Sequence, residues 1–176
     1  MSRGPVDAEA DFGAFVKPGR FSHLTDPVLI FGECKTFGTF YDRDYRRMGN
    51  LAKLFPGAMT CFCTLKGELT RPEKTWIAVL ARQGRKTLKT GQRKNPVLVL
   101  TGNELYGQFK IGSFTDDYPS QFSKLGAGAF LRGDLQEISD FTQQVHLGIE
   151  SYDKWLEAQR GAPRGKRATQ PGTPRP

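Results

Sequence analysis

The chain has 176 residues, 38% of them hydrophobic and 25% charged, and its 26 Lys and Arg outnumber its 18 Asp and Glu to give a net charge of +8. This composition is typical of a soluble globular domain and excludes wholesale disorder. No apolar run reaches the roughly 18 residues of a membrane helix, and the first ten residues lack the apolar core of a secretory signal. The positive charge favours a polyanionic partner, nucleic acid before a membrane surface.

Two segments concentrate the basic residues. Residues 160–176 hold five basic residues, four prolines and no acidic residue, which predicts a disordered basic tail after a single domain spanning 1–159. Residues 82–94 hold six basic residues and no acidic one, and form either a solvated helix end and loop or an edge that contacts phosphates. The candidate nucleic-acid-binding residues of this segment are Arg82, Arg85, Lys86, Lys89, Arg93 and Lys94.

The apolar patterns, taken in chain order, predict alternating strands and helices. Strands are expected at 11–16, 28–36, 58–65 and 97–101, and helices at about 42–55, 70–83 and 135–159. The second helix should begin at a capping box, Thr70-Arg71-Pro72-Glu73. Residues 108–133 give no clear prediction. Two opening strands followed by strand–helix alternation predict an α/β protein, with a mixed sheet flanked by helices.

The cysteines and tryptophans carry little functional signal. Three cysteines and no secretion signal favour a reducing compartment, and we expect a cytoplasmic protein. Cys61 and Cys63 should face one side of a strand as ordinary buried thiols, because no second Cys/His pair accompanies them for zinc. Trp76 and Trp155 are expected to anchor the apolar core.

The chemistry-bearing pattern lies at the end of the second strand. Glu33 and Lys35 share one face there, as either a surface ion pair or catalytic groups. If the first two strands form a hairpin whose turn centres on residue 22, paired residue numbers sum to 44 and Asp11 lies across from Glu33. Two adjacent carboxylates repel each other, and a divalent cation such as Mg²⁺ removes the conflict. Lys35 could then orient or help to deprotonate a metal-bound water.

These residues resemble the motif of the PD-(D/E)xK nuclease superfamily, which has the restriction-endonuclease-like fold. The resemblance covers about residues 7–105, because DRDYRRMGNLAKLFPGAMTCFCTLK is similar to the helix and strand that follow the motif and NPVLVLTGNEL to the last core strand. It implies Mg²⁺-dependent hydrolysis of phosphodiester bonds in DNA, with Mn²⁺ as the alternative metal. Asp11, Glu33 and the Cys34 carbonyl would be metal ligands, and Lys35 would position the water. Backbone contacts to DNA and a homodimer are the partners that the resemblance implies.

The pattern departs from the superfamily at its start. A core helix normally precedes the Asp strand, but only ten residues precede Asp11 and they lack helical apolar periodicity, so the first helix is expected to be missing. Glu9 and Asp7 are candidate substitute acids on the Asp11 face. Asp42 and Asp44 open a helix and are expected to serve as caps. Two alternatives stay open: an inactive nucleic-acid-binding module of the same fold, and a protein with a different partner whose basic tail is incidental.

Overall fold

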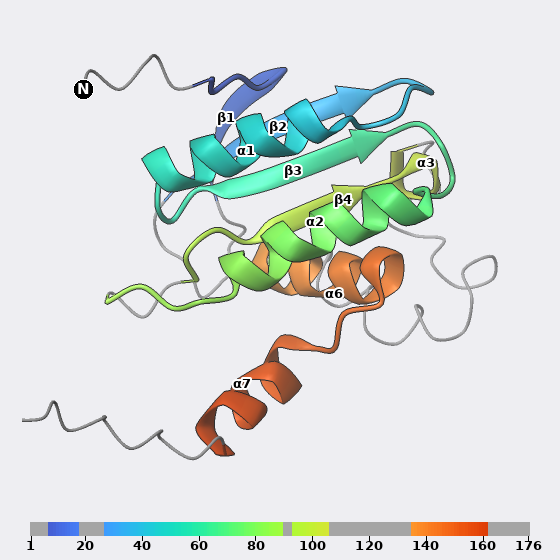
Figure 1. The fold of residues 1–176 in the computed structure, drawn as a ribbon. Coiled ribbons are helices and arrows are strands. Elements are labelled where there is room, and N and C mark those ends of the chain that lie inside the picture. The colour runs from blue at the N-terminus through green and yellow to red at the C-terminus, as the bar shows by residue number, and fades with distance from the viewer. Residues whose placement is uncertain (1–6, 18–26, 90–92, 106–134, 162–176) are drawn as a thin grey trace, which may run out of the picture.

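The chain has an α/β fold built on a four-stranded mixed sheet flanked by helices (Figure 1). The computed structural model describes residues 7–17, 27–89, 93–105 and 135–161. The strands lie side by side in chain order: β1 (Phe12–Val16), β2 (Val28–Lys35), β3 (Met59–Thr64) and β4 (Val97–Leu100). β1 is antiparallel to β2, and β2, β3 and β4 are parallel. The predicted α/β class, with a mixed sheet flanked by helices, and all four predicted strands are confirmed. None of the helices in the described ranges has the length and apolarity needed to cross a bilayer.

The register between β1 and β2 brings Asp11 to the end of β2. Phe12 lies opposite Gly32 and Val16 opposite Val28, so the paired numbers sum to 44 as the sequence predicts. The Asp11 amide continues this pairing by donating a hydrogen bond of 2.9 Å to the Gly32 carbonyl. Gly32 leaves room for the Phe12 ring, because a Cβ there would come within 1.9 Å of a ring carbon and the ring would have to move.

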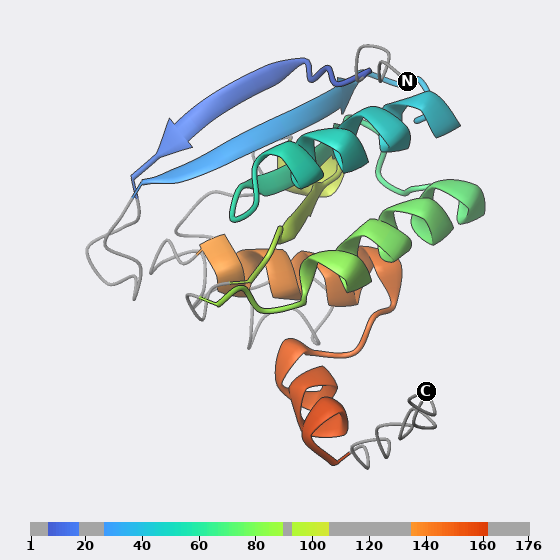
Figure 2. The same ribbon diagram turned by 60° about the vertical axis from the view of Figure 1, so that its left-hand side comes forward.

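Two helices lie over the same face of the sheet (Figure 2). They are α1 (Asp42–Leu54) and α2 (Arg71–Gly84), and both begin in a capping box, with Asp44 and Glu73 as the acidic members. The box predicted at the start of α2 is confirmed. Apolar residues of both helices form one buried cluster with three strand residues: Phe62, Val97 and Val99. Because α1 connects β2 to β3 and α2 connects β3 to β4, both helices run back from the carboxyl ends of the parallel strands.

The free edge of β4 is covered by α6 (Leu135–Leu147). The Val97 carbonyl accepts hydrogen bonds from Ser139 Oγ and Gln143 Nε2, both at 2.8 Å, and the Val99 amide donates to Thr142 Oγ1 at 3.2 Å. An uncovered strand edge would offer these groups to another chain. Figure 2 shows α6 running beside β4, next to α2.

The single helix predicted over 135–159 is wrong. Gly148 adopts a left-handed conformation (φ 62°) that ends α6, and α7 (Tyr152–Gly161) follows. Ile149, between the two helices, turns its side chain into the buried cluster of α1 and α2. The short helix α3 (Gly102–Leu105) was not predicted.

The expectations for the tail, the cysteines and the tryptophans have different outcomes. The first two residues of the predicted tail end α7; the rest, 162–176, and the unassigned segment 108–133 lie outside the described residues. Cys61 and Cys63 do face one side, with their sulfurs 3.3 Å apart. The expectation for Trp76 is wrong, because 38% of this residue is exposed beside α1 rather than buried in the core. Trp155 is not a core anchor either, because α7 has no buried residue and its ring stacks on Tyr152.

Candidate functional site

The carboxyl end of β2 brings three predicted site residues together. Lys35 Nζ lies 2.6 Å from Glu33 Oε1, so the two side chains that the period of the strand places on one face do meet. The Cys34 amide between them donates a hydrogen bond of 2.6 Å to Asp11 Oδ2. Asp11 is exposed, whereas Glu33 is 6% exposed, so the site has one open and one buried carboxylate.

Asp44 is a fourth member that sequence reasoning assigned only to helix capping. It does cap α1, because its Oδ2 accepts the Tyr41 amide hydrogen at 2.8 Å. The same oxygen also lies 3.4 Å from Lys35 Nζ, and Asp44 is 1% exposed. A signal for this role exists in the sequence. The helix after a strand of a parallel pair begins near that strand's carboxyl end, so its first-turn acids approach any site there.

Electrostatic crowding perturbs Glu33. Burial raises the pKa of its carboxyl group, the hydrogen bond and charge of Lys35 oppose that effect, and the charges of Asp11 and Asp44 add to it. The net result is a raised pKa. One ammonium group therefore does not compensate for burial together with two neighbouring carboxylates, and a further positive charge would stabilise the ionised form.

The pKa of Lys35 is also raised, although burial acts on it in the opposite direction. Burial alone would lower its pKa, but the hydrogen bond and charge of Glu33, together with the charge and hydrogen bond of Asp44, outweigh burial and raise it. Lys35 is therefore an ammonium at neutral pH. Such a group donates hydrogen bonds and stabilises negative charge, which suits the water-orienting role better than the deprotonating one.

The residues at this site fit Mg²⁺ in their donor chemistry. Mg²⁺ prefers oxygen ligands and is held by one or two carboxylates while it keeps several waters, and Asp11 and Glu33 supply two carboxylates in mutual repulsion. No cluster of three or more His, Cys, Asp or Glu residues suited to a metal occurs in the described part of the chain. Burial, followed by the neighbouring Cys63, raises the pKa of the Cys34 thiol to about 12, so this group is a neutral thiol at pH 7. The Cys34 carbonyl oxygen is the candidate ligand, because Mg²⁺ prefers oxygen.

The two substitute acids do not join this site. Asp7 Oδ1 lies 3.0 Å from Arg47 Nε and Glu9 Oε2 lies 2.6 Å from Arg47 NH1, on the outer side of α1. The Asp7 carbonyl also accepts a hydrogen bond of 2.9 Å from Asn50 Nδ2. These contacts tie the segment before β1 to α1, which gives both acids a structural role in place of the predicted catalytic one.

The basic residues of 82–94 differ widely in exposure. Arg85 is 1% exposed, and its guanidinium bonds to Gln143 Oε1 at 3.2 Å and Asp140 Oδ1 at 3.1 Å on α6. It holds two helices together and cannot reach a nucleic-acid backbone from the core, so the expectation for Arg85 is corrected. The Arg93 guanidinium stacks on the Tyr152 ring, 3.6 Å from its centroid. The remaining members are exposed or half-buried: Arg82, Lys86, Lys89 and Lys94.

This basic segment lies at the opposite end of the sheet from the carboxylates. The Lys94 carbonyl accepts a hydrogen bond from the Gly57 amide, just before β3, whereas Glu33 lies beside Phe62 near the end of β3. Phe62 follows Gly57 by five residues, which span about 16 Å when extended. That distance corresponds to about five base pairs of duplex, so one bound nucleic acid could contact both ends.

Comparison of the chain with protein-family models gives no match, and searches of curated proteins and of solved structures give none either. The side chains at the end of β2 are therefore the basis on which a function can be inferred.

Proposed function

We propose that this chain is a magnesium-dependent nuclease that hydrolyses phosphodiester bonds in DNA, with a restriction-endonuclease-like form of the α/β fold. One observation carries the proposal: Asp11, Glu33 and Lys35 converge at the carboxyl end of β2, where the register pairs Asp11 with the Glu33–Cys34 segment. The raised pKa of Glu33 supports it, because perturbed carboxylates are enriched at functional sites.

The roles of the residues follow from their charges. Asp11 and Glu33, with the Cys34 carbonyl, would hold Mg²⁺, which supplies a Lewis acid for the phosphate and a more acidic water. Lys35 donates hydrogen bonds to the attacking water or to the charge that develops on the phosphate, as a preorganised cation does. Asp44 keeps Lys35 in place when the Glu33 carboxylate is engaged elsewhere, because its Oδ2 lies 3.4 Å from Lys35 Nζ.

Cleavage assays with matched variants test the proposal. Labelled single- and double-stranded DNA is incubated with Mg²⁺ and with wild type, Asp11→Asn or Lys35→Met. Each variant should cut at least about 100-fold more slowly, because each removes a group that stabilises charge in the transition state. Asp153→Asn and Lys154→Met, an exposed pair on α7, are the controls and should cut at the wild-type rate. Cleavage that persists in both site variants contradicts the assignment.

A second candidate function is an inactive nucleic-acid-binding module of the same fold. The observation that favours it is the close contact between Lys35 and Glu33, because an ammonium 2.6 Å from the carboxylate already neutralises part of the site without a metal. This module would bind DNA equally well in EDTA and in Mg²⁺, with no cleavage in either. The nuclease would cut only when the divalent ion is present.

A further inference from the structure

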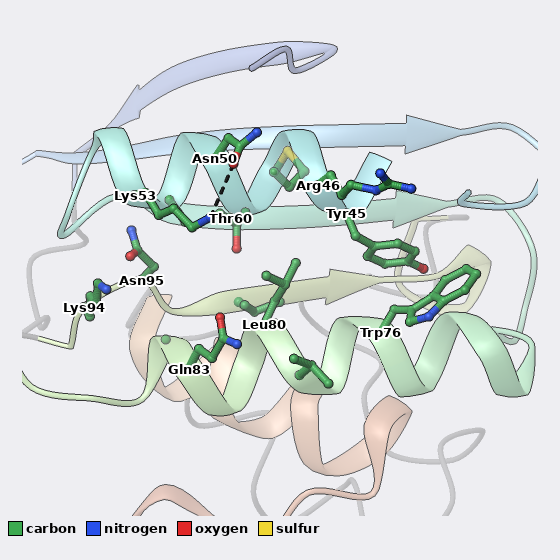
Figure 3. A pocket seen from close by; sticks show the side chains of 16 residues that line it. Tyr45, Arg46, Asn50, Lys53, Thr60, Trp76, Leu80, Gln83, Lys94 and Asn95 are labelled. Carbon is green, nitrogen blue, oxygen red and sulfur yellow. Dashed lines mark hydrogen bonds between the residues drawn. The ribbon is translucent and has the colours of Figure 1, made fainter. Parts of the chain in front are cut away.

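A groove separates α1 from α2 on the helical face of the sheet (Figure 3). Its volume of about 470 Å³ is in the range of sites that hold small molecules or single ligand groups. The helices contribute residues at helical spacing, and the strands and the segment before β4 form the floor. The α1 wall includes Tyr45, Arg46, Gly49, Asn50 and Lys53, and the α2 wall includes Trp76, Val79, Leu80 and Gln83.

Two buried hydroxyl groups line the groove without a partner. Thr60 Oγ1 and the Tyr45 hydroxyl make no hydrogen bond within the described residues, although the two residues are only 2% and 6% exposed. Figure 3 shows the Thr60 hydroxyl, from β3, pointing into the space between the helices. An unpaired buried hydroxyl costs about 1–3 kcal/mol, so a ligand with hydrogen-bonding atoms would gain affinity by pairing with these groups.

Charge and aromatic character narrow the ligand class. The lining residues include three basic side chains and no acidic one: Arg46, Lys53 and Lys94. Arg46 pairs with Asp42, outside the groove, which leaves Lys53 and Lys94 as the main cations facing a ligand. At the other end the Trp76 ring stands edge-on to Tyr45, with centroids 4.8 Å apart. A flat ring with polar edges and a linked phosphate matches the unpaired hydroxyls, the aromatic end and the cationic end of the groove. An aliphatic carboxylate held by Lys53 and Lys94 would place only its apolar chain against the two hydroxyls.

We propose that the groove binds one nucleotide unit of single-stranded DNA, with the base between α1 and α2 and the phosphate near Lys53 and Lys94. The inference rests on the proposed function, since it names single-stranded DNA as the substrate class of that nuclease. Aromatic faces and a cationic edge are the usual means of holding single strands. The groove extends from Tyr45, next to Asp44 of the carboxylate site, toward Lys94 and the exposed lysines of 82–94. A strand in it would connect the two ends of the sheet.

Trp76 provides a direct binding signal. In a Trp155→Phe background it is the only tryptophan, so its fluorescence is titrated with the trinucleotide dT3 in EDTA at low salt. We expect saturable quenching by dT3 and none by decanoate at the same concentration. No saturable change with dT3, or equal affinity for decanoate, overturns the inference.

Thr60→Val is the decisive variant because it keeps the shape of the side chain and removes the unpaired hydroxyl. It should weaken dT3 binding about 2- to 10-fold and leave the unfolding free energy unchanged or higher. Thr75→Val, an exposed position on α2 outside the groove, is the matched control and should bind like the background protein. Undiminished binding by Thr60→Val contradicts the placement of the base.

The phosphate position and the link to cleavage are tested separately. Lys53→Ala and Lys94→Ala should each reduce the slope of log affinity against log salt by about 0.7, the value for one contact to a single strand; an unchanged slope in both contradicts the phosphate position. Because the titration is done in EDTA, it does not depend on catalysis. Binding of dT3 without cleavage would overturn only the nuclease proposal, and cleavage without dT3 binding would overturn only this inference.

Discussion

Buried glutamates occur in two contrasting surroundings in this molecule. Glu104, on α3, accepts hydrogen bonds from the Thr101 amide and hydroxyl, both at 2.6 Å, and lies 2.9 Å from His146 Nε2. Glu73, in the cap of α2, accepts hydrogen bonds from Thr70 and from the Phe40 amide. Burial alone would raise the pKa of both groups, but these hydrogen bonds, with nearby positive charge, lower it.

Glu33 is equally buried but has only Lys35 as a charged hydrogen-bond partner, and two carboxylates, Asp11 and Asp44, stand nearby. Its pKa is raised where those of Glu73 and Glu104 are lowered. The difference shows that burial does not by itself decide whether the pKa of a glutamate is raised. A carboxylate whose surroundings disfavour its ionised form is the one that gains from a cation.

Acid should have the largest effect on stability, because it protonates the hydrogen-bonded carboxylates of Glu73 and Glu104 together. A group with a lowered pKa in the folded state adds stability that is present above the unfolded-state value, about 4.5, and is lost as the pH falls through the folded-state value. We expect the unfolding free energy from urea titrations to decrease steadily below about pH 4.5. A protein as stable at pH 3 as at pH 6 would contradict the lowered values.

Glu104→Gln should give the largest loss of any single glutamate. The amide cannot accept from Thr101 and His146 as the carboxylate does, and a buried donor is left against other donors, so we expect a loss of about 2–3 kcal/mol at pH 7. Urea unfolding measures this loss. The control is Glu157→Gln, an exposed position on α7, whose unfolding free energy should stay within about 0.5 kcal/mol of the wild-type value. A loss no larger than the control's would show that the Glu104 contacts are unimportant.

Glu73→Gln should cost less, about 1 kcal/mol, because glutamine can still fill a capping box. The expected loss comes from the hydrogen bonds of Phe40 and Thr70 to a charged acceptor and from Lys66, whose Nζ lies 3.6 Å from Glu73 Oε1. The same unfolding measurement applies, and the variant should also lose part of the decrease in stability below pH 4.5. If Glu73→Gln loses as much stability below pH 4.5 as the wild type does, the loss must come from other groups.

Glu33→Gln should have the smallest effect on stability. Unlike Glu73→Gln and Glu104→Gln, it should not lower the unfolding free energy. A group with a raised folded-state pKa contributes stability below about pH 4.5 that is lost as the pH rises through the folded-state value, so ionised Glu33 disfavours folding at neutral pH. We expect an unfolding free energy at pH 7 that is unchanged or higher, within about 1 kcal/mol. A loss above 2 kcal/mol would place Glu33 with the structural glutamates.

Local patterns were enough to predict most of the sheet and the approach of Asp11 to Glu33. The alternation along β2, the capping box at Thr70 and the constant sum of a hairpin all depend on neighbours in sequence or on one turn. The second role of Asp44 was missed because capping explains an acid in a first helical turn completely, and the contact with Lys35 depends on how α1 packs on β2.

The other differences between the sequence predictions and the structure arise from contacts between residues far apart in the chain. Arg85 is buried by α6, whose partners Asp140 and Gln143 lie more than 50 residues away, so a basic segment does not reveal which of its members face solvent. The helix over 135–159 breaks because Gly148 can adopt positive φ and Ile149 gains burial against α1 and α2. Helical periodicity in the sequence cannot predict that gain in burial. Trp76 stays 38% exposed because it lies at the groove between α1 and α2, where Tyr45 covers only part of its ring.

Carboxyl-carbon NMR titration of the glutamates, with and without Mg²⁺, tests the central contrast most directly. Glu33→Gln, Glu73→Gln and Glu104→Gln assign the three resonances. The account predicts that Glu33 titrates above about 4.5 without metal and shifts downward when Mg²⁺ is added, whereas Glu73 and Glu104 titrate below 4.5 and do not respond. A Glu33 carboxyl that titrates below 4.5, or whose titration is the same with Mg²⁺, would contradict the assignment of this site to a metal-dependent nuclease.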